Sequence, residues 1–107
     1  MKTQRTEFNL KVQDCIEGMK EMPNASVDLV VTSPPYNLGI KYKNYKDNKS
    51  REKYLEWCCE WAKEIKRILK DNGSFFLFFG ACPSNPLVPH ELLVQLKGDA
   101  VGFSLQN

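Results

Sequence analysis

The pattern of apolar and polar positions predicts strands that alternate with helices. Residues Phe8–Gln13 have an apolar side chain at every second position, which is the period-two pattern of a strand, and this segment ends at Asp14. The apolar residues of Ile16–Met22 recur at three-residue spacing and predict a short helix that ends before Pro23. The run Val27–Val31 is short, rich in valine and almost continuously apolar, so we expect a strand that is covered on both faces.

The second half of the chain repeats this alternation. In Arg51–Lys70 the apolar residues recur every three or four positions, which predicts an amphipathic helix that Ser50 caps. The pair Asn72-Gly73 is expected to end this helix. The aromatic run Ser74–Phe79 is too short for a helix and predicts another buried strand.

A further helix and the start of a strand are expected near the end of the chain. A loop with several prolines leads into a helix predicted over His90–Leu96. Residues Val101–Leu105 then begin like a strand. Because the chain stops two residues later without a turn or a polar tail, we expect it to be the first part of a longer domain.

Helices between strands that are apolar on both sides are typical of an α/β fold with a mostly parallel sheet. In such sheets ligands bind beyond the carboxyl ends of the strands. Three features follow directly after predicted strands, namely Asp14, the turn Ser33–Tyr36 and Gly80. We therefore expect all three at one edge of the sheet.

Composition places the chain among ordinary globular domains. Its 107 residues suffice for one domain, and a hydrophobic fraction of 42% with 26% charged residues fits neither a disordered chain nor a membrane protein. No apolar window approaches the roughly 20 residues of a membrane span, and no signal peptide is recognisable, so we expect a cytoplasmic protein. The four cysteines and the one histidine lack metal-ligand spacing, which predicts reduced thiols and no metal site.

The turn Ser33-Pro34-Pro35-Tyr36 has chemistry of its own. Two consecutive prolines fix their φ angles and restrict the residue before them, so the turn is stiff. It offers the Ser33 hydroxyl and the Pro34 carbonyl as hydrogen-bond acceptors beside the ring of Tyr36. Two acceptors and an aromatic ring suit a planar group that carries an NH₂, such as a nucleobase. An ordinary proline turn after a strand is the alternative interpretation.

Positive charge is concentrated directly after this turn. The net charge is only +2, but the segment between positions 41 and 53 contains six cationic and two acidic residues, with two tyrosines among them. A base leaves a duplex at a cost of a few kcal/mol, of which stacking on one aromatic ring returns about 1–3 kcal/mol, so contacts to the nucleic-acid backbone have to supply the rest. A solvated loop explains the same charges. Four lysines are the predicted DNA contacts: Lys41, Lys43, Lys46 and Lys49.

The turn and its surroundings resemble a known family. Thr32–Tyr36, preceded by Asp14-Cys15-Ile16 and by Met22–Leu29, resembles the amino-methylating DNA methyltransferases of restriction-modification systems. The resemblance extends over the long helix, the aromatic strand and the loop Pro83–Pro89, and thus over nearly the whole chain. It implies a Rossmann-like class I methyltransferase fold that transfers a methyl group from S-adenosylmethionine to the exocyclic amine of a flipped base. The serine version of the motif is associated with N4 of cytosine, and the aspartate version with N6 of adenine.

The resemblance also implies roles for individual residues. Those predicted to bind the target amine and the base ring form one turn: Ser33, Pro34, Pro35 and Tyr36. Those predicted to lie near the cofactor are Asp14, Cys15 and Thr32. A cap for the helix that follows is an equally good interpretation of Asp14. The implied partners are double-stranded DNA and a cognate restriction endonuclease.

One feature of the family is missing from the sequence. The chain contains no glycine-rich turn of the F-x-G-x-G type, which in this family holds the cofactor. We therefore expect residues 1–107 to be the N-terminal catalytic part of a methyltransferase domain of the permuted group, without the cofactor half and with little activity alone. The alternatives are methylation of N6 of adenine, of an RNA base or of a glutamine side chain, and an inactive chain that needs a partner for its cofactor half.

Overall fold

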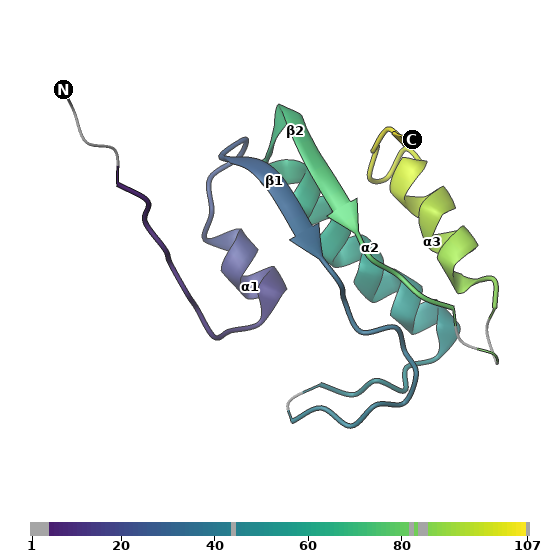
Figure 1. Cartoon of the computed structure of the whole chain (residues 1–107). Coiled ribbons are helices and arrows are strands. Elements are labelled where there is room, and N and C mark those ends of the chain that lie inside the picture. Colours follow the sequence, from purple (N-terminus) through teal and green to yellow (C-terminus); the bar gives the residue numbers. More distant parts are fainter. Residues whose placement is uncertain (1–4, 44, 82, 84–85, 107) are drawn as a thin grey trace.

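The chain folds into a small parallel sheet with helices packed on one side (Figure 1). The computed structural model describes residues 5–43, 45–81, 83 and 86–106. Its elements follow in the order α1 (Cys15–Lys20), β1 (Val27–Thr32), α2 (Arg51–Ile68), β2 (Leu69–Leu77) and α3 (Val88–Lys97). The predicted α/β alternation is confirmed for these elements. The bounds of α1, β1, α2 and α3 differ from the predicted ones by one or two residues, whereas β2 begins five residues before the predicted Ser74 and ends two before the predicted Phe79. No described helix combines the length and the hydropathy that crossing a membrane requires.

The two strands lie side by side and run in the same direction. Leu29 pairs with Ser74, and Thr32 pairs with Leu77, near the carboxyl ends of both strands. The N–H of Phe78 donates to the Thr32 carbonyl at 3.0 Å, which extends the pairing beyond β2. Both strands therefore finish at the same edge, and the polypeptide after each of them starts from a defined place.

The end of α2 differs from the prediction. We predicted that this helix reaches Lys70 and stops at Asn72-Gly73, but it ends at Ile68, and Leu69 already pairs with Val27. The side chain of Leu69 is 7% exposed, so its place in the core and its pairing with β1 determine where the helix ends. The pair Asn72-Gly73 lies within β2, where the register of the two strands shifts.

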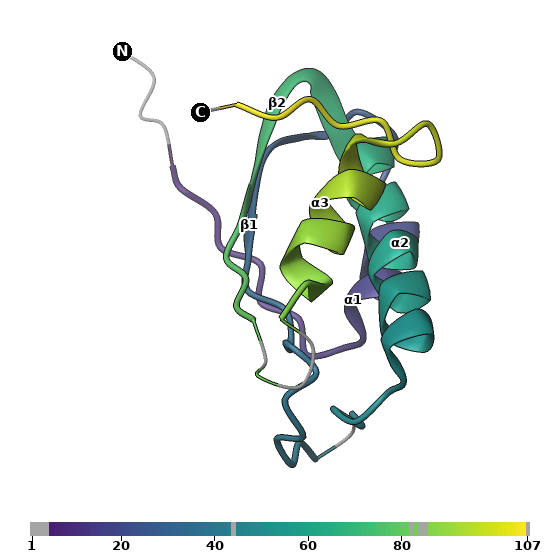
Figure 2. The same cartoon turned by 90° about the vertical axis from the view of Figure 1, so that its right-hand side faces the viewer.

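The core lies between the sheet and the two helices α2 and α3, which cover the same face (Figure 2). On α3, Leu92 and Leu96 are buried. At the ends of these helices, Arg51 Nε donates to Glu91 Oε2 at 2.7 Å. The buried stripe of α2 that faces this core consists of Tyr54, Leu55, Cys58, Trp61, Ala62 and Ile65.

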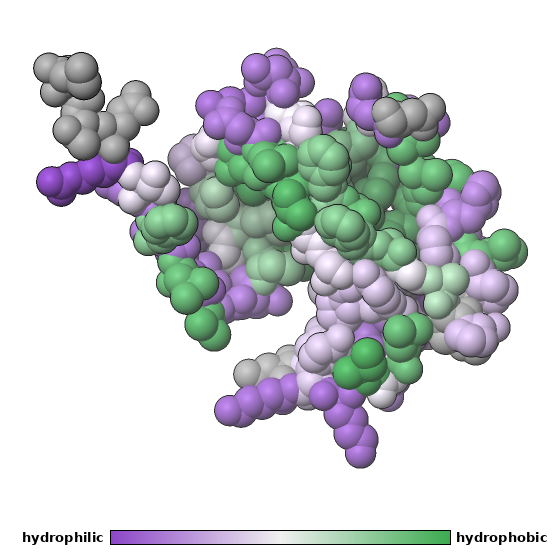
Figure 3. Space-filling model, in the orientation of Figure 1, coloured by the Kyte–Doolittle hydropathy of each residue, from purple (hydrophilic) through white to green (hydrophobic). Residues whose placement is uncertain are grey.

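The opposite face of the sheet is exposed. Leu29, Val31, Phe76 and Phe78 point to this side and are 54%, 58%, 57% and 63% exposed. Figure 3 shows apolar side chains gathered over β1 and β2 in the orientation of Figure 1. The prediction that β1 is covered on both faces is therefore wrong for the described residues, because the helices pack on one face only.

Two predicted strands do not form. Residues Phe8–Gln13 run away from the body as an extended arm (Figure 1), and the three apolar side chains of this arm are at least 91% exposed. A strand requires a neighbour for its backbone hydrogen bonds, and neither described strand lies beside this arm. Residues Val101–Leu105 form a turn and an irregular segment instead. The Phe103 N–H donates to the Leu96 carbonyl, and the Phe103 ring packs on that of Phe75 with centroids 5.2 Å apart.

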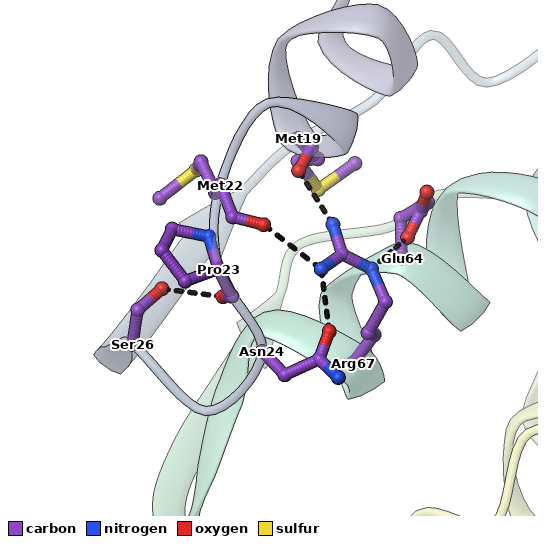
Figure 4. A network of polar contacts seen from close by, with 7 residues as sticks. All are labelled: Met19, Met22, Pro23, Asn24, Ser26, Glu64 and Arg67. Carbon is purple, nitrogen blue, oxygen red and sulfur yellow. Dashed lines mark hydrogen bonds and ion pairs between the residues drawn. The ribbon is translucent and has the colours of Figure 1, made fainter.

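Arg67 of α2 fastens the segment between α1 and β1 (Figure 4). Its guanidinium donates to the carbonyls of Met19 at 2.6 Å and Met22 at 2.8 Å, and to Asn24 Oδ1 at 2.8 Å. Glu64, one turn earlier on the helix, accepts from Arg67 Nε at 2.6 Å and orients the guanidinium. One side chain therefore holds the entry to β1 against α2.

Candidate functional site

The turn Ser33–Tyr36 leaves β1 at the edge where both strands finish, as predicted from the sequence. No described residue of this turn belongs to a helix or strand, and its backbone is held by side chains from elsewhere. The Pro35 carbonyl accepts a hydrogen bond from the Tyr54 hydroxyl of α2. Tyr54 is fully buried, and this burial raises the pKa of its hydroxyl, which therefore remains a hydrogen-bond donor.

The ring of Tyr36 is half-buried and packs against the chain that follows β2. Its centroid lies 5.0 Å from that of Phe79, with the two planes at 55°. A Cβ atom at Gly80 would lie 3.3 Å from Cδ2 and Cε2 of Tyr36, so the absence of a side chain at Gly80 makes room for the ring. One side of the Tyr36 ring is thus fixed, and the end of β2 determines its orientation.

The hydroxyl groups of Ser33 and Tyr36 are hydrogen-bonded to each other. Ser33 Oγ lies 2.6 Å from Tyr36 Oη, and either oxygen can be the donor. The sequence predicted Ser33 as an acceptor beside a separate aromatic ring, whereas the structure joins the two side chains. When Ser33 donates to Tyr36, the lone pairs of Ser33 Oγ remain able to accept from an amine. Ser33 is exposed, so a ligand can approach this oxygen.

Asp47 holds the segment that follows Tyr36. It is 2% exposed and accepts from the backbone N–H of Asn37 at Oδ1 and from those of Leu38 and Ile40 at Oδ2, each at 3.0 Å. The Asn37 side chain in turn bonds both backbone groups of Lys49, at 2.7 and 2.8 Å. The sequence predicted no site role for Asp47, Asn37 or Tyr54, and its only signal was a lone aspartate among lysines.

The predicted DNA contacts lie on the loop that Asp47 holds. Lys41, Lys43 and Lys46 are exposed, and Lys41 and Lys46 form an isolated antiparallel bridge. The Lys49 ammonium instead lies 3.9 Å from the centre of the Tyr45 ring and donates to the Lys46 carbonyl at 3.1 Å. Burial and the nearby Asp47 carboxylate raise the pKa of Tyr45 to about 12, so this ring stays neutral under the lysine. Three of the four lysines therefore extend into solvent.

The residues predicted near the cofactor do not form a cofactor site by themselves. Asp14 caps α1, because its Oδ2 accepts from the Glu17 N–H at 3.1 Å, so the cap interpretation is confirmed. Burial of the thiol and the neighbouring Asp14 carboxylate raise the pKa of Cys15. Thr32 ends β1 with its carbonyl engaged by Phe78. One carboxylate oxygen of Asp14 is thus already used, and the other has no hydrogen-bond partner among the described residues. Without the glycine-rich turn, these three residues alone do not make a complete site for S-adenosylmethionine.

A cavity of about 720 Å³ lies elsewhere, between β2, α3 and the segment 103–106. Apolar side chains such as Phe75, Leu92 and Phe103 contribute to its walls, and none of the predicted site residues does. Among the described residues no group of three or more histidine, cysteine, aspartate or glutamate side chains is placed to hold a metal ion.

A parallel α/β unit that carries a rigid S-P-P-Y turn and a basic loop at one rim has the arrangement of a methyltransferase that acts on amino groups. Residues 27–106 match the family of DNA methylases called N6_N4_Mtase. This match covers most of the chain, which therefore belongs to the DNA methylase family.

Individual relatives agree with this family. The type II methyltransferase M.HpaI of Haemophilus parainfluenzae is 42% identical over 67 residues, which are 63% of this chain and 21% of that protein. M.PvuII of Proteus hauseri is 32% identical over 102 residues, covering 91% of this chain and 30% of that protein. The structure of the cytosine-N4-specific PvuII DNA methyltransferase superimposes with a TM-score of 0.70 at 33% identity, covering 88% of this chain and 34% of the other. The chain thus has a methyltransferase fold in part and spans between a fifth and about a third of these relatives.

Proposed function

We propose that this chain provides the base-binding part of an enzyme that methylates N4 of a cytosine flipped out of double-stranded DNA. The observation that carries the proposal is the Ser33–Tyr36 turn, which lies at the rim of a fold similar to that of a cytosine-N4-specific methyltransferase. The exposed Ser33 hydroxyl accepts from the amine, and the half-buried ring of Tyr36 stacks on the base. S-adenosylmethionine supplies the methyl group; Asp14, Cys15 and Thr32 would lie near it, and the glycine-rich turn that holds it in the family is not among residues 1–107.

The contribution of this chain is to position the amine. An NH₂ group that donates to fixed oxygens is held in one orientation, and such positioning accounts for a large part of the rate of group transfer. The bonds from the Tyr54 hydroxyl to Pro35 and from the Asn37 N–H to Asp47 fix the turn before the base arrives. The basic loop contacts the DNA backbone, since a flipped base needs more binding energy than one aromatic ring supplies.

Adenine N6 is the second candidate target, because the matched family includes methyltransferases of both amines. The proposal further assigns the enzyme to the cytoplasm and to a restriction-modification pair with a cognate endonuclease. The lack of a glycine-rich turn leads us to expect weak binding of S-adenosylmethionine by the 107-residue chain alone. Tight binding in a titration calorimeter would contradict this part of the proposal.

A chimera tests the proposed reaction. The matched segment of the PvuII methyltransferase is replaced by this chain, and the purified protein is incubated with unmethylated DNA and S-adenosylmethionine. Mass spectrometry of the hydrolysed nucleosides is expected to show N4-methylcytosine. Ser33→Ala and Tyr36→Ala are each expected to lower the rate by about 10- to 100-fold, since a stacking contact contributes about 1–3 kcal/mol. The exposed Ser104→Ala is the matched control.

The outcomes of this experiment are distinct. N6-methyladenine as the product would establish the second candidate. A folded chimera that binds S-adenosylmethionine but methylates neither base would contradict the proposed function. Equal rates for Ser33→Ala and Ser104→Ala would show that the Ser33 hydroxyl has no role.

A further inference from the structure

The carboxylate of Asp47 is an unusual feature of the loop after Tyr36. Among the described residues, Asp47 is the charged one that is buried, with an exposed fraction of 2%, although the loop around it is polar. Its two oxygens accept from three backbone N–H groups, those of Asn37, Leu38 and Ile40, each at 3.0 Å. Bonds from N–H groups to an ionised carboxylate are among the stronger hydrogen bonds in proteins. The charge of Asp47 is therefore used inside the loop and not for a surface ion pair.

Asn37 adds a second set of bonds to the same loop, and we call Asp47 and Asn37 together the clamp. The side-chain amide of Asn37 donates to the Lys49 carbonyl at 2.7 Å and accepts from the Lys49 N–H at 2.8 Å, so that it bonds Lys49 as a paired strand residue would. Asn37 has a φ of 61°, a left-handed conformation that asparagine tolerates better than most residues. The Gly39 N–H adds a bond to the Asp47 carbonyl at 2.7 Å. Positions 37–40 are thus tied to positions 47 and 49.

The clamp closes a loop whose outer side is positive. Lys41, Lys43 and Lys46 are exposed on it, and Lys41 and Lys46 face each other across an isolated bridge. Like charges on directly opposite residues of an antiparallel pair repel each other and are destabilising. The bonds of Asp47 oppose this repulsion and keep the cations together in the absence of any anion.

We infer that Asp47 is a positioning residue, which holds the basic loop in the conformation that binds the DNA backbone. The inference rests on the proposed function, because it takes DNA as the partner of the loop. A loop that is ordered in advance loses less conformational entropy on binding, and preorganisation of this kind increases affinity. Asp47 touches neither DNA nor a base in this account and acts through the lysines.

The test compares the same substitution at the buried Asp47 and at the exposed Asp99. Asp47→Asn and Asp99→Asn each raise the net charge by one, and Asp99 is exposed on the turn after α3. Attraction between charges alone predicts that both variants bind DNA at least as well as the wild type. The clamp predicts the opposite for Asp47→Asn, because its NH₂ group faces a backbone N–H in either orientation of the amide. We expect about tenfold weaker binding of a fluorescent DNA duplex for this variant alone.

The dependence on salt provides a second readout. The slope of log K against log salt counts the phosphates that the protein contacts. We expect it to be the same for wild type and Asp47→Asn, since both have the same lysines, and smaller for Lys41→Gln. Hydrogen exchange of the Asn37, Leu38 and Ile40 amides without DNA is expected to be slow in the wild type and fast in Asp47→Asn.

Each contrary result is informative. Equal DNA affinity of Asp47→Asn and Asp99→Asn overturns the positioning role and leaves DNA binding intact. Fast exchange of the three amides in the wild type overturns the clamp itself. Slow exchange together with no salt-dependent DNA binding refutes the DNA partner and with it this inference. Should Asp47→Asn fail to fold, Asn37→Gly keeps the left-handed backbone, removes both side-chain bonds to Lys49 and is expected to weaken DNA binding in the same way.

Discussion

Buried polar side chains hold the rim of the sheet at the level of single residues. Tyr54 and Asp47 bond backbone groups on either side of Tyr36, in a segment that lies outside the helices and strands. Backbone groups that are shielded from water need such partners, because a buried group that loses its hydrogen bond costs about 1–3 kcal/mol. The shape of the candidate site therefore depends on residues that touch no ligand.

Removal of one hydroxyl tests this dependence. Tyr54→Phe keeps the ring in the core and leaves the Pro35 carbonyl without its donor. We expect the free energy of unfolding, measured with urea, to fall by about 1–3 kcal/mol. Tyr42→Phe is the control, because Tyr42 is 45% exposed, and we expect its effect to stay within about 0.5 kcal/mol. Equal effects of the two substitutions would show that the hydroxyl of Tyr54 contributes nothing specific.

At the scale of elements, α2 connects the parts of the structure. It begins beside the basic loop, where Ser50 caps it with a bond from the Lys53 N–H at 3.3 Å, and it runs directly into β2 at Leu69. Tyr54 near its start holds the turn after β1, and Arg67 near its end holds the segment before β1. Both ends of β1 are thus positioned by one helix.

Arg67→Lys tests the connection at the start of β1. One ammonium cannot reproduce the planar arrangement of donors to Met19, Met22 and Asn24, so at least one of these oxygens, of which that of Met19 is part-buried, loses its charged donor. We expect a loss of about 2–3 kcal/mol in the free energy of unfolding. The control is Arg51→Lys, whose partner Glu91 lies near the surface, with an expected loss of at most about 1 kcal/mol. A loss for Arg67→Lys no larger than that of the control would refute the role of this network.

In the molecule as a whole, one face of the sheet is covered by helices and the other is exposed. Parallel sheets are normally covered on both faces and contain more than two strands. Here α2 and α3 cover one face, while four large apolar side chains of the other face are more than half exposed (Figure 3). The relatives M.HpaI and M.PvuII are roughly three times as long as this chain.

The exposed face predicts how the isolated chain behaves. Phe76 and Phe78 are 57% and 63% exposed, so the native chain is expected to bind a hydrophobic dye such as anilinonaphthalene sulfonate. The double substitution Phe76→Ser and Phe78→Ser is expected to reduce dye fluorescence several-fold. Leu87→Ser, at an equally exposed residue outside the sheet, is the control. Unchanged fluorescence in the double variant would locate the apolar surface elsewhere.

The sequence by itself determined the elements whose signals are local. The three- and four-residue spacing of α2, its serine cap and the valine-rich run of β1 depend only on neighbours along the chain, and the structure confirmed them. The position of Ser33–Tyr36 at the end of a strand followed from the same pattern, because an apolar run that meets two prolines cannot continue as a strand.

Only the tertiary structure decided which segments pair and which side chains hold the site. Phe8–Gln13 has the pattern of a strand, but a strand exists only where another backbone accepts its hydrogen bonds, and neither strand of the described part of the chain does so. The bonds of Tyr54 and Asp47 join residues that are 19 and 10 positions apart, and no periodic pattern encodes such a distance. Local periodicity reports the burial of a segment, whereas the partner of a buried polar group depends on how the folded chain returns to the same place.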